Sequence, residues 1–436
     1  MGVAVAVAVL VPGCARVNPA FEDGRDAAEG SGAGTSMGTT GTAPTESAST
    51  LPTGSASGVT GSGTLPTTTM PPASDVGVSG PSSDTGVMPS DWWDTEYAHR
   101  MPLVFHQREE PLLDFVTYVP LSFSPSRLEG VSMSQLAFVD VATDMRIPAE
   151  IAVFDPAAGE VAAWVQLPVW RADGPTEVFL YFGFTAPEVP SASPWSRHVA
   201  VWHMDEVTDA GSTPDAAGSA DASQVGAVVA SVGEVPGVVG GALEFDGEEH
   251  RLEAVLSSSP SEDSFLVSGW LNAASYPQLG FPLIARGDSV GPSWLDAEWA
   301  MGCSSDERAE GRLHDDQSND SPQSSIGVSV PSANEWHHYA FLYAGSTVRF
   351  YVDGAGAVSG GVEPDAEHVI DTVSIGGYSS IVTEGWEERL LEGRIDELRW
   401  RRGADEDAPN DVWVETLYES QLTPETTFTP APVEDL

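Results

Sequence analysis

Residues 334–354 read NEWHHYAFLYAGSTVRFYVDG, and this stretch decides the fold of the C-terminal half of the chain. Aromatic and β-branched residues recur with a period of two on both sides of Ala344-Gly345-Ser346, which is typical of two strands joined by a tight turn. Asp353-Gly354 begins the next turn. One face of the first strand carries Trp336, His338, Ala340 and Leu342, and the other carries His337, Tyr339, Phe341 and Tyr343. The stretch therefore predicts a β-hairpin within a sheet.

The composition excludes some classes of function. The chain has 436 residues and a formal net charge of −47, and all 18 of its basic residues are arginine. Because no basic patch is available to neutralise phosphates, we expect no nucleic-acid partner. The two cysteines cannot staple a small scaffold, so each domain must rely on its own core.

The N-terminus resembles a bacterial lipoprotein signal peptide. Residues 1–13 are apolar and end in small residues directly before Cys14, which would become the diacylated first residue. The alternative is a buried N-terminal strand, because Val and Ala alternate here. Residues 14–90 are rich in Gly, Ser, Thr and Pro, so we expect a disordered tether. This resemblance implies a lipid anchor in the cell envelope, at the outer membrane or cell surface if the host has two membranes.

Residues 91–197 are predicted to form a β-sandwich. Clusters of Pro, Gly, Asp and Ser separate six short apolar runs, and helical periodicity is weak. The runs are Met101–His106, Phe115–Leu121, Gln135–Val139, Glu150–Phe154, Val161–Leu167 and Glu177–Phe182. The order of LLDFVTYVPLSF, AAWVQLPVW and TEVFLYFGF before a VWH junction resembles the DUF2341 family, which implies an architecture but no established activity.

Residues 198–425 are predicted to form a second sandwich. They contain, in order, VAVWHMDE, GGALEFDG, FLVSGW, EWHHYA, FYVDG, SIGG and GRIDEL. This order resembles the concanavalin A-like LamG (laminin G-like) domain, which implies a jelly-roll of two packed antiparallel sheets. Residues 410–420 have a partial apolar stripe that indicates a helix. Residues 426–436 are predicted to be a C-terminal tail.

The LamG resemblance also implies one calcium ion, held by carboxylate and backbone oxygens near a rim of the sheets. Asp246, on the FDG turn, and Asp396, on the GRID strand, match positions that serve this role. The alternative is that both residues cap turns and strand ends. His337 and His338 are adjacent on a strand and face opposite sides, so they cannot share an ion.

Exposed aromatic rings would stack on sugar rings if the second sandwich binds glycans. Trp294, Trp299 and Trp386 lie in loop-like or edge segments and are predicted to bind the ligand. The alternative is that these side chains only pack against the protein.

A glycosidase on this fold would need two or three carboxylates on one face of a strand. Asp296 and Glu298 have the required spacing, but a third carboxylate is lacking. Asp396 and Glu397 are adjacent, so a regular strand would place them on opposite faces.

The sequence therefore predicts an all-β, non-enzymatic surface lipoprotein whose LamG-like domain binds a glycan or a protein partner. The alternative is a polysaccharide-active hydrolase on the same fold, and a third possibility is a structural spacer of the envelope. A cleft with paired carboxylates about 5–10 Å apart would favour the hydrolase. The lack of both a cleft and an aromatic platform would favour the spacer.

Overall fold

The computed structural model describes residues 92–436, within one compact unit, Pro89–Leu436. The exceptions are residues 184, 189–190, 209–210, 219, 226–232, 249, 257–263, 277–279, 287–298, 305–307, 314–323, 362–371, 383–384 and 404–408. The predicted signal peptide, Cys14 and the predicted tether lie outside the described residues. Among the described residues, no helix is long and apolar enough to cross a membrane.

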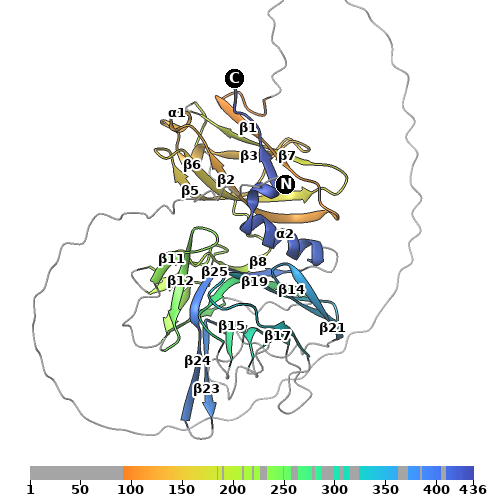
Figure 1. Ribbon diagram of the computed structural model, residues 1–436. Helices are drawn as coiled ribbons and strands as arrows, with labels where there is room; N and C mark the ends of the chain where they lie inside the picture. Colours follow the sequence, from red (N-terminus) through yellow and green to blue (C-terminus); the bar gives the residue numbers. More distant parts are fainter. Residues whose placement is uncertain are drawn as a thin grey trace, which may run out of the picture. The chain divides into compact units, whose positions relative to one another are not determined.

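The first sandwich consists of a six-stranded and a three-stranded antiparallel sheet, here called sheets A and B (Figure 1). Sheet A has the order β26 (Phe428–Pro430), β1 (His99–Phe105), β7 (Thr176–Phe182), β3 (Ala137–Asp140) and β4 (Met145–Arg146), and β27 (Glu434–Asp435) also pairs with β1. Sheet B has the order β2 (Leu112–Ser122), β6 (Glu160–Trp170) and β5 (Ala149–Asp155). Two short helices, α1 (Pro125–Leu128) and η1 (Met133–Gln135), lie between β2 and β3 in the chain. Each of the six predicted runs contains a strand, although the run Gln135–Val139 begins in η1 and becomes a strand only at Ala137.

The C-terminal residues return to the first sandwich. Phe428 of β26 pairs with Phe105 of β1 and is only 3% exposed, and Asp435 of β27 pairs with His99. Residues 426–436, predicted to be a tail, therefore complete sheet A, and the second sandwich is an insertion between two parts of the first. The sequence did not indicate these strands because they are too short to show a period.

The second sandwich packs two eight-stranded antiparallel sheets, here called sheets C and D. Sheet C has the order β11 (Gly233–Pro236), β12 (Gly241–Asp246), β25 (Glu392–Arg402), β14 (Ser264–Ala273), β19 (His337–Ala344), β20 (Thr347–Val352) and β21 (Ala355–Gly361), with β8 (His198–Trp202) also on β25. Sheet D has the order β18 (Ser324–Ser329), β17 (Arg308–Leu313), β16 (Trp299–Cys303), β15 (Phe281–Arg286), β22 (Thr372–Ile375), β13 (Arg251–Val255), β10 (Ala222–Val225) and β9 (Ser212–Thr213). A separate hairpin of β23 (Gly377–Val382) and β24 (Gly385–Leu390) projects from this sandwich (Figure 1).

The hairpin predicted at residues 334–354 is β19 and β20, and both of its faces are buried. Tyr339 and Phe341 point into the core between sheets C and D. Ala340 and Leu342, on the other face, pack into the core of the first sandwich. Because each fully buried large apolar side chain contributes about 1.5–3 kcal/mol, this strand stabilises two cores at once. The double burial explains why neither face of its sequence is polar.

The helix α2 (Asp411–Leu422) lies between the two sandwiches (Figure 1). Asn410 caps its start by accepting a hydrogen bond from the backbone N–H of Trp413. The Trp413 ring lies 4.8 Å from the Phe115 ring of β2, and Trp270 of β14 donates its indole N–H to Gln421. The helix and the first sandwich therefore cover part of the outer face of sheet C, and the part they leave open is where a ligand has access.

Candidate functional site

A cleft of about 630 Å³ opens at one end of sheet C, where strands β12, β25 and β14 lie side by side. The register places Glu244 opposite Arg394, and Asp246 opposite Glu392. Side chains directly opposite each other in a sheet point to the same face. Leu243 and Phe245 point into the core, so these four charged side chains stand on the outer face. The lining is completed by Phe245, Asn272, Ala274, Asn334 and Gly393.

The polar groups of the cleft are fixed by local contacts. Arg394 forms an ion pair with Glu244, with Nη2 to Oε1 at 2.9 Å. Asp246 accepts a hydrogen bond from the backbone N–H of Glu248 and lies 2.7 Å from the Nδ1 of His250. The Asn334 amide donates to the carbonyl of Ala274. The cleft thus combines carboxylate acceptors, amides and a guanidinium donor, which are the groups that hydrogen-bond hydroxyls.

The sequence prediction placed Asp246 and Asp396 at one calcium ion, and the structure separates them. Asp246 is paired with Glu392, and Asp396 lies four residues further along β25. At about 3.3 Å per residue, the two positions are about 13 Å apart along the sheet. These two carboxylates therefore do not share an ion, which corrects the prediction of a joint site.

Asp396 lies in a buried, hydrogen-bonded environment. The residue is 0% exposed, and its Oδ2 accepts hydrogen bonds from the backbone N–H groups of Val238 and Val239 at 2.6 and 2.9 Å. Burial, and then the neighbouring Glu397, raise the pKa of Asp396 far above its usual value. One oxygen of this buried carboxylate is thus already engaged by the backbone. Asp246 retains access to solvent, with Glu392 opposite it, so calcium at Asp246 stays a prediction.

The three tryptophans predicted to bind a ligand differ in position. Trp299 begins β16, is 1% exposed and packs edge-on against Trp400 at 4.9 Å. Trp299 is therefore a core residue, which corrects its prediction as a platform. The sequence signal was the uncharged run WAMGC, which is typical of a strand buried on both faces, and every residue of β16 is buried. Trp386 lies on β24, opposite Ile381. Trp294 lies outside the described residues, as do Asp296 and Glu298 of the predicted glycosidase pair.

A buried charged cluster joins the two sandwiches, and sequence reasoning missed it. His203, after β8, places Nδ1 2.9 Å from the Oε1 of Glu397 on β25 and Nε2 3.2 Å from the Oε1 of Glu150 on β5. Arg399 donates to Glu397 at 2.7 Å and lies over the Trp164 ring at 4.0 Å. Both sandwiches thus contribute carboxylates to one imidazole.

The electrostatics of this cluster favour a charged imidazole. Burial acts to lower the pKa of His203, but Glu397 and Glu150 outweigh burial and raise the pKa to about 10. Burial likewise acts to raise the pKa of Glu397, but His203 and Arg399 lower it below the usual value. The cluster is an ion network that contains side chains of both sandwiches, so we assign it to holding the sandwiches together.

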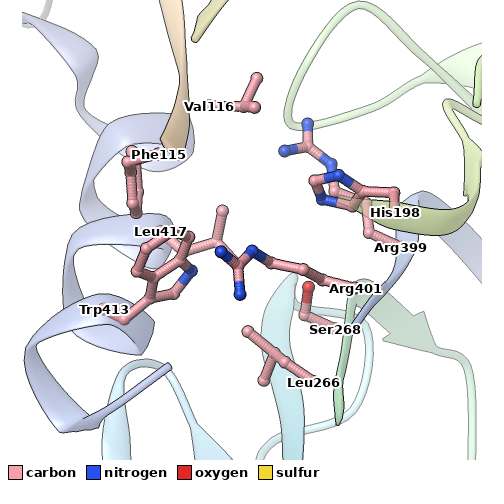
Figure 2. Close-up of a pocket in the computed structure, with 9 residues that line it drawn as sticks. All are labelled: Phe115, Val116, His198, Leu266, Ser268, Arg399, Arg401, Trp413 and Leu417. Carbon is pink, nitrogen blue, oxygen red and sulfur yellow. The ribbon is translucent and has the colours of Figure 1, made fainter. Parts of the chain in front are cut away.

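A cavity of about 20 Å³ lies beside this cluster, between the sandwiches (Figure 2). Figure 2 shows the Arg401 guanidinium directed toward Trp413, at 4.2 Å from the ring centre. Burial, followed by Arg399 and Arg401, lowers the pKa of His198 well below its usual value. The lining comprises Phe115, Val116, His198, Leu266, Ser268, Arg399, Arg401, Trp413 and Leu417. A space of this size holds about one water and cannot hold a sugar.

The family comparison agrees with the second sandwich. Residues 247–405 match the Laminin_G_3 family, described as the concanavalin A-like lectin/glucanases superfamily. This part of the chain is a concanavalin A-like domain. The match includes Glu392 and Arg394 of the cleft and begins immediately after Asp246. No curated protein sequence matches the chain.

Solved structures resemble parts of the chain at low identity. Botulinum neurotoxin type C, which interacts with two ganglioside molecules, is 16% identical, with 52% of each chain covered and a TM-score of 0.39. A Trypanosoma rangeli sialidase is 13% identical, with 63% of this chain and 45% of that chain covered and a TM-score of 0.39. Domain 4 of the arabinanase AbnA from Geobacillus stearothermophilus is 17% identical, with 51% and 98% covered and a TM-score of 0.35. The matched part thus spans about half the length of the toxin and sialidase chains.

Proposed function

We propose that the second sandwich binds a glycan in the cleft at the end of sheet C. The observation that carries the proposal is a cleft of about 630 Å³ whose charged and amide side chains stand on one open sheet face. Most of the residues that line it lie within the segment that matches the lectin/glucanase superfamily, and the others directly precede that segment. A volume of this size accommodates a short oligosaccharide, since small-molecule sites span roughly 300–1,000 Å³.

The lining suits hydroxyl groups, which both donate and accept hydrogen bonds. Asp246 and Glu392 can accept from sugar hydroxyls, Arg394 can donate to them, and Asn272 can do both. A site built this way discriminates strongly, because a ligand without matching hydroxyls leaves polar groups unpaired. The proposal does not depend on the predicted tryptophan platforms.

A glycan array and titration calorimetry on the full chain test the proposal. Asn272→Ala removes one donor and one acceptor from the cleft without changing its charge, and we expect it to weaken binding by about tenfold, as for a typical net hydrogen bond. Ser126→Ala, on the exposed side of α1 in the first sandwich, is the matched control and should bind as the wild type does. Equal affinity of both variants would place the ligand elsewhere, and silence on the array would contradict glycan binding.

A specific observation keeps hydrolysis as the second candidate. Asp246 and Glu392 are directly opposite in register, so their Cβ atoms lie about 5 Å apart and both carboxyl groups can reach one glycosidic bond, as a glycosidase requires. Both side chains are exposed to solvent, whereas such enzymes place one acid in apolar surroundings. We therefore favour binding without cleavage. Release of reducing ends from a bound polysaccharide, lost in Glu392→Gln, would establish the hydrolase instead.

In this proposal the chain acts at the cell envelope, with a lipid on Cys14 as its membrane partner and residues 14–90 as a tether. The support is the apolar segment that precedes Cys14 in the sequence, and the polar composition that follows it. The first sandwich, with its resemblance to the DUF2341 family, would then connect the tether to the glycan-binding domain.

A further inference from the structure

The cleft of the second sandwich carries an excess of negative charge. Three carboxylates line it, on Glu244, Asp246 and Glu392, against one guanidinium, on Arg394. The lining therefore has a formal charge of −2. The guanidinium is already paired with Glu244, so on the other side of the cleft the charged side chains of the lining are the carboxylates of Asp246 and Glu392. The imidazole of His250 contacts Asp246 at 2.7 Å from outside this lining, and Glu392 stands opposite Asp246 as the second carboxylate.

Asp246 and Glu392 lie close enough together to act on the same bound sugar. They lie opposite each other on adjacent strands, so a bound sugar ring that contacts one also approaches the other. An opposite charge within about 4–6 Å is attracted and a like charge is repelled, and salt screens such exposed groups only partly at that distance. An ammonium group on the sugar therefore strengthens binding to this cleft, and a carboxylate, sulfate or phosphate group on the sugar weakens it.

We infer that this cleft selects glycans with free amino groups over neutral glycans, and neutral glycans over acidic ones, through Asp246 and Glu392. The inference rests on the proposed function and adds the class of sugar. The net charge of the whole chain, −47, has the same sign and reinforces the exclusion of acidic polymers at long range.

The test is an array of oligosaccharides from chitosan, chitin, cellulose, alginate and pectin, probed with the full chain in the presence of a chelator. The chelator ensures that the side chains alone set the charge of the cleft. We expect amino oligosaccharides to bind about tenfold or more tightly than acidic ones of equal length, as one charge contact in water-exposed surroundings allows. Acidic glycans that bind as well as amino ones would overturn the inference and leave glycan binding intact. An array without any bound glycan would overturn the proposed function itself.

Variants that remove one negative charge test whether the cleft, and not the rest of the protein surface, sets the preference among glycans. Glu392→Gln and Asp246→Asn keep side-chain shape, and each should reduce the ratio of amino to acidic binding by several-fold. The matched control is Glu177→Gln, an exposed carboxylate on β7 of the first sandwich, which should leave the ratio unchanged. A ratio that stays constant in both cleft variants, or falls equally in Glu177→Gln, would overturn the inference.

Discussion

The Nε2 of His203 lies 3.2 Å from the Oε1 of Glu150, and this contact crosses from the second sandwich to the first. The other ring nitrogen faces Glu397 at 2.9 Å. The imidazole is therefore held between carboxylates of two sheets, with the Trp164 ring stacked at 5.9 Å and 12°. One charged ring thus couples β5 of the first sandwich to β25, the strand that also supplies the cleft with Glu392 and Arg394.

Replacement of His203 should strongly destabilise the protein. His203→Gln removes the positive charge and leaves the buried Glu397 with Arg399 as its ionic partner. Breaking a buried ion pair in this way typically costs about 3–5 kcal/mol. Urea denaturation of the variant measures the loss, and the exposed control Glu177→Gln should unfold with the wild-type midpoint. A midpoint that His203→Gln does not change would contradict the role of the network.

The same residue gives the stability a defined pH dependence. The pKa of His203 is raised from 6.5 to about 10 in the folded protein, because Glu397 and Glu150 outweigh the effect of burial. Such a group contributes its full stability below the unfolded pKa and loses it as the pH rises through the folded pKa. The free energy of unfolding should therefore fall between about pH 6.5 and pH 10, and fall less in His203→Gln. Parallel slopes for the two proteins in this range would contradict a charged imidazole.

The strands were predictable from the sequence because residues that recur with a period of two lie on the same face of a strand. The faces assigned to residues 334–354 are those of β19 and β20. The turn that follows, between β20 and β21, has Asp353 and Gly354 at φ 53° and 76°, as a two-residue hairpin turn requires. The sequence did not show what the outer face of β19 packs against. Ala340 and Leu342 look like any apolar strand residues, and only tertiary structure shows that they contact the first sandwich.

The local geometry of Asp396 and Glu397 was not predictable either. A regular strand would place them on opposite faces, but β25 has a bulge opposite the Ser268–Trp270 segment of β14, and Glu397 has a φ of 50°. As a result, His203 acts on the pKa of both carboxyls. The cleft residue Glu392 was missed for a related reason. Its pairing with Asp246 depends on register, which a single sequence does not specify.

The lipid anchor predicts a simple change in localisation. Cys14→Ser removes the thiol that would be acylated, so the protein should move from the membrane fraction to the soluble fraction of the cell. Western blots of both fractions measure the distribution, with Cys303→Ser as the control because Cys303 is buried in β16. Membrane association that survives Cys14→Ser would contradict the anchor.

Calcium binding at Asp246 stays a prediction, and thermal melting tests it. A ligand that binds the folded state alone raises the melting midpoint, so calcium should raise it and a chelator should reverse the rise. Asp246→Asn should abolish this response, whereas Asp396→Asn should change the midpoint equally with and without calcium, because Asp396 is buried. A wild-type midpoint that the chelator does not move would contradict calcium binding.

Removal of the C-terminal strands should unfold the first sandwich in preference to the second. Deletion of residues 428–436 removes β26, β27 and the Phe428 side chain, which packs 5.4 Å from Phe105 in the core. Loss of a buried phenylalanine typically costs about 3–5 kcal/mol, and the deletion also exposes one edge of β1. Hydrogen exchange should show the loss first in β1 and β7, with β14 and β19 still protected. Deletion of residues 434–436 is the control that removes β27 but keeps Phe428. It breaks the exposed ion pairs of Asp435, which contribute little, and the 2.6 Å pair of Glu434 with the buried Arg100, so we expect a smaller loss of stability than from deletion of residues 428–436. Equal destabilisation by the two deletions would show that β27, and not the buried Phe428, completes the first sandwich.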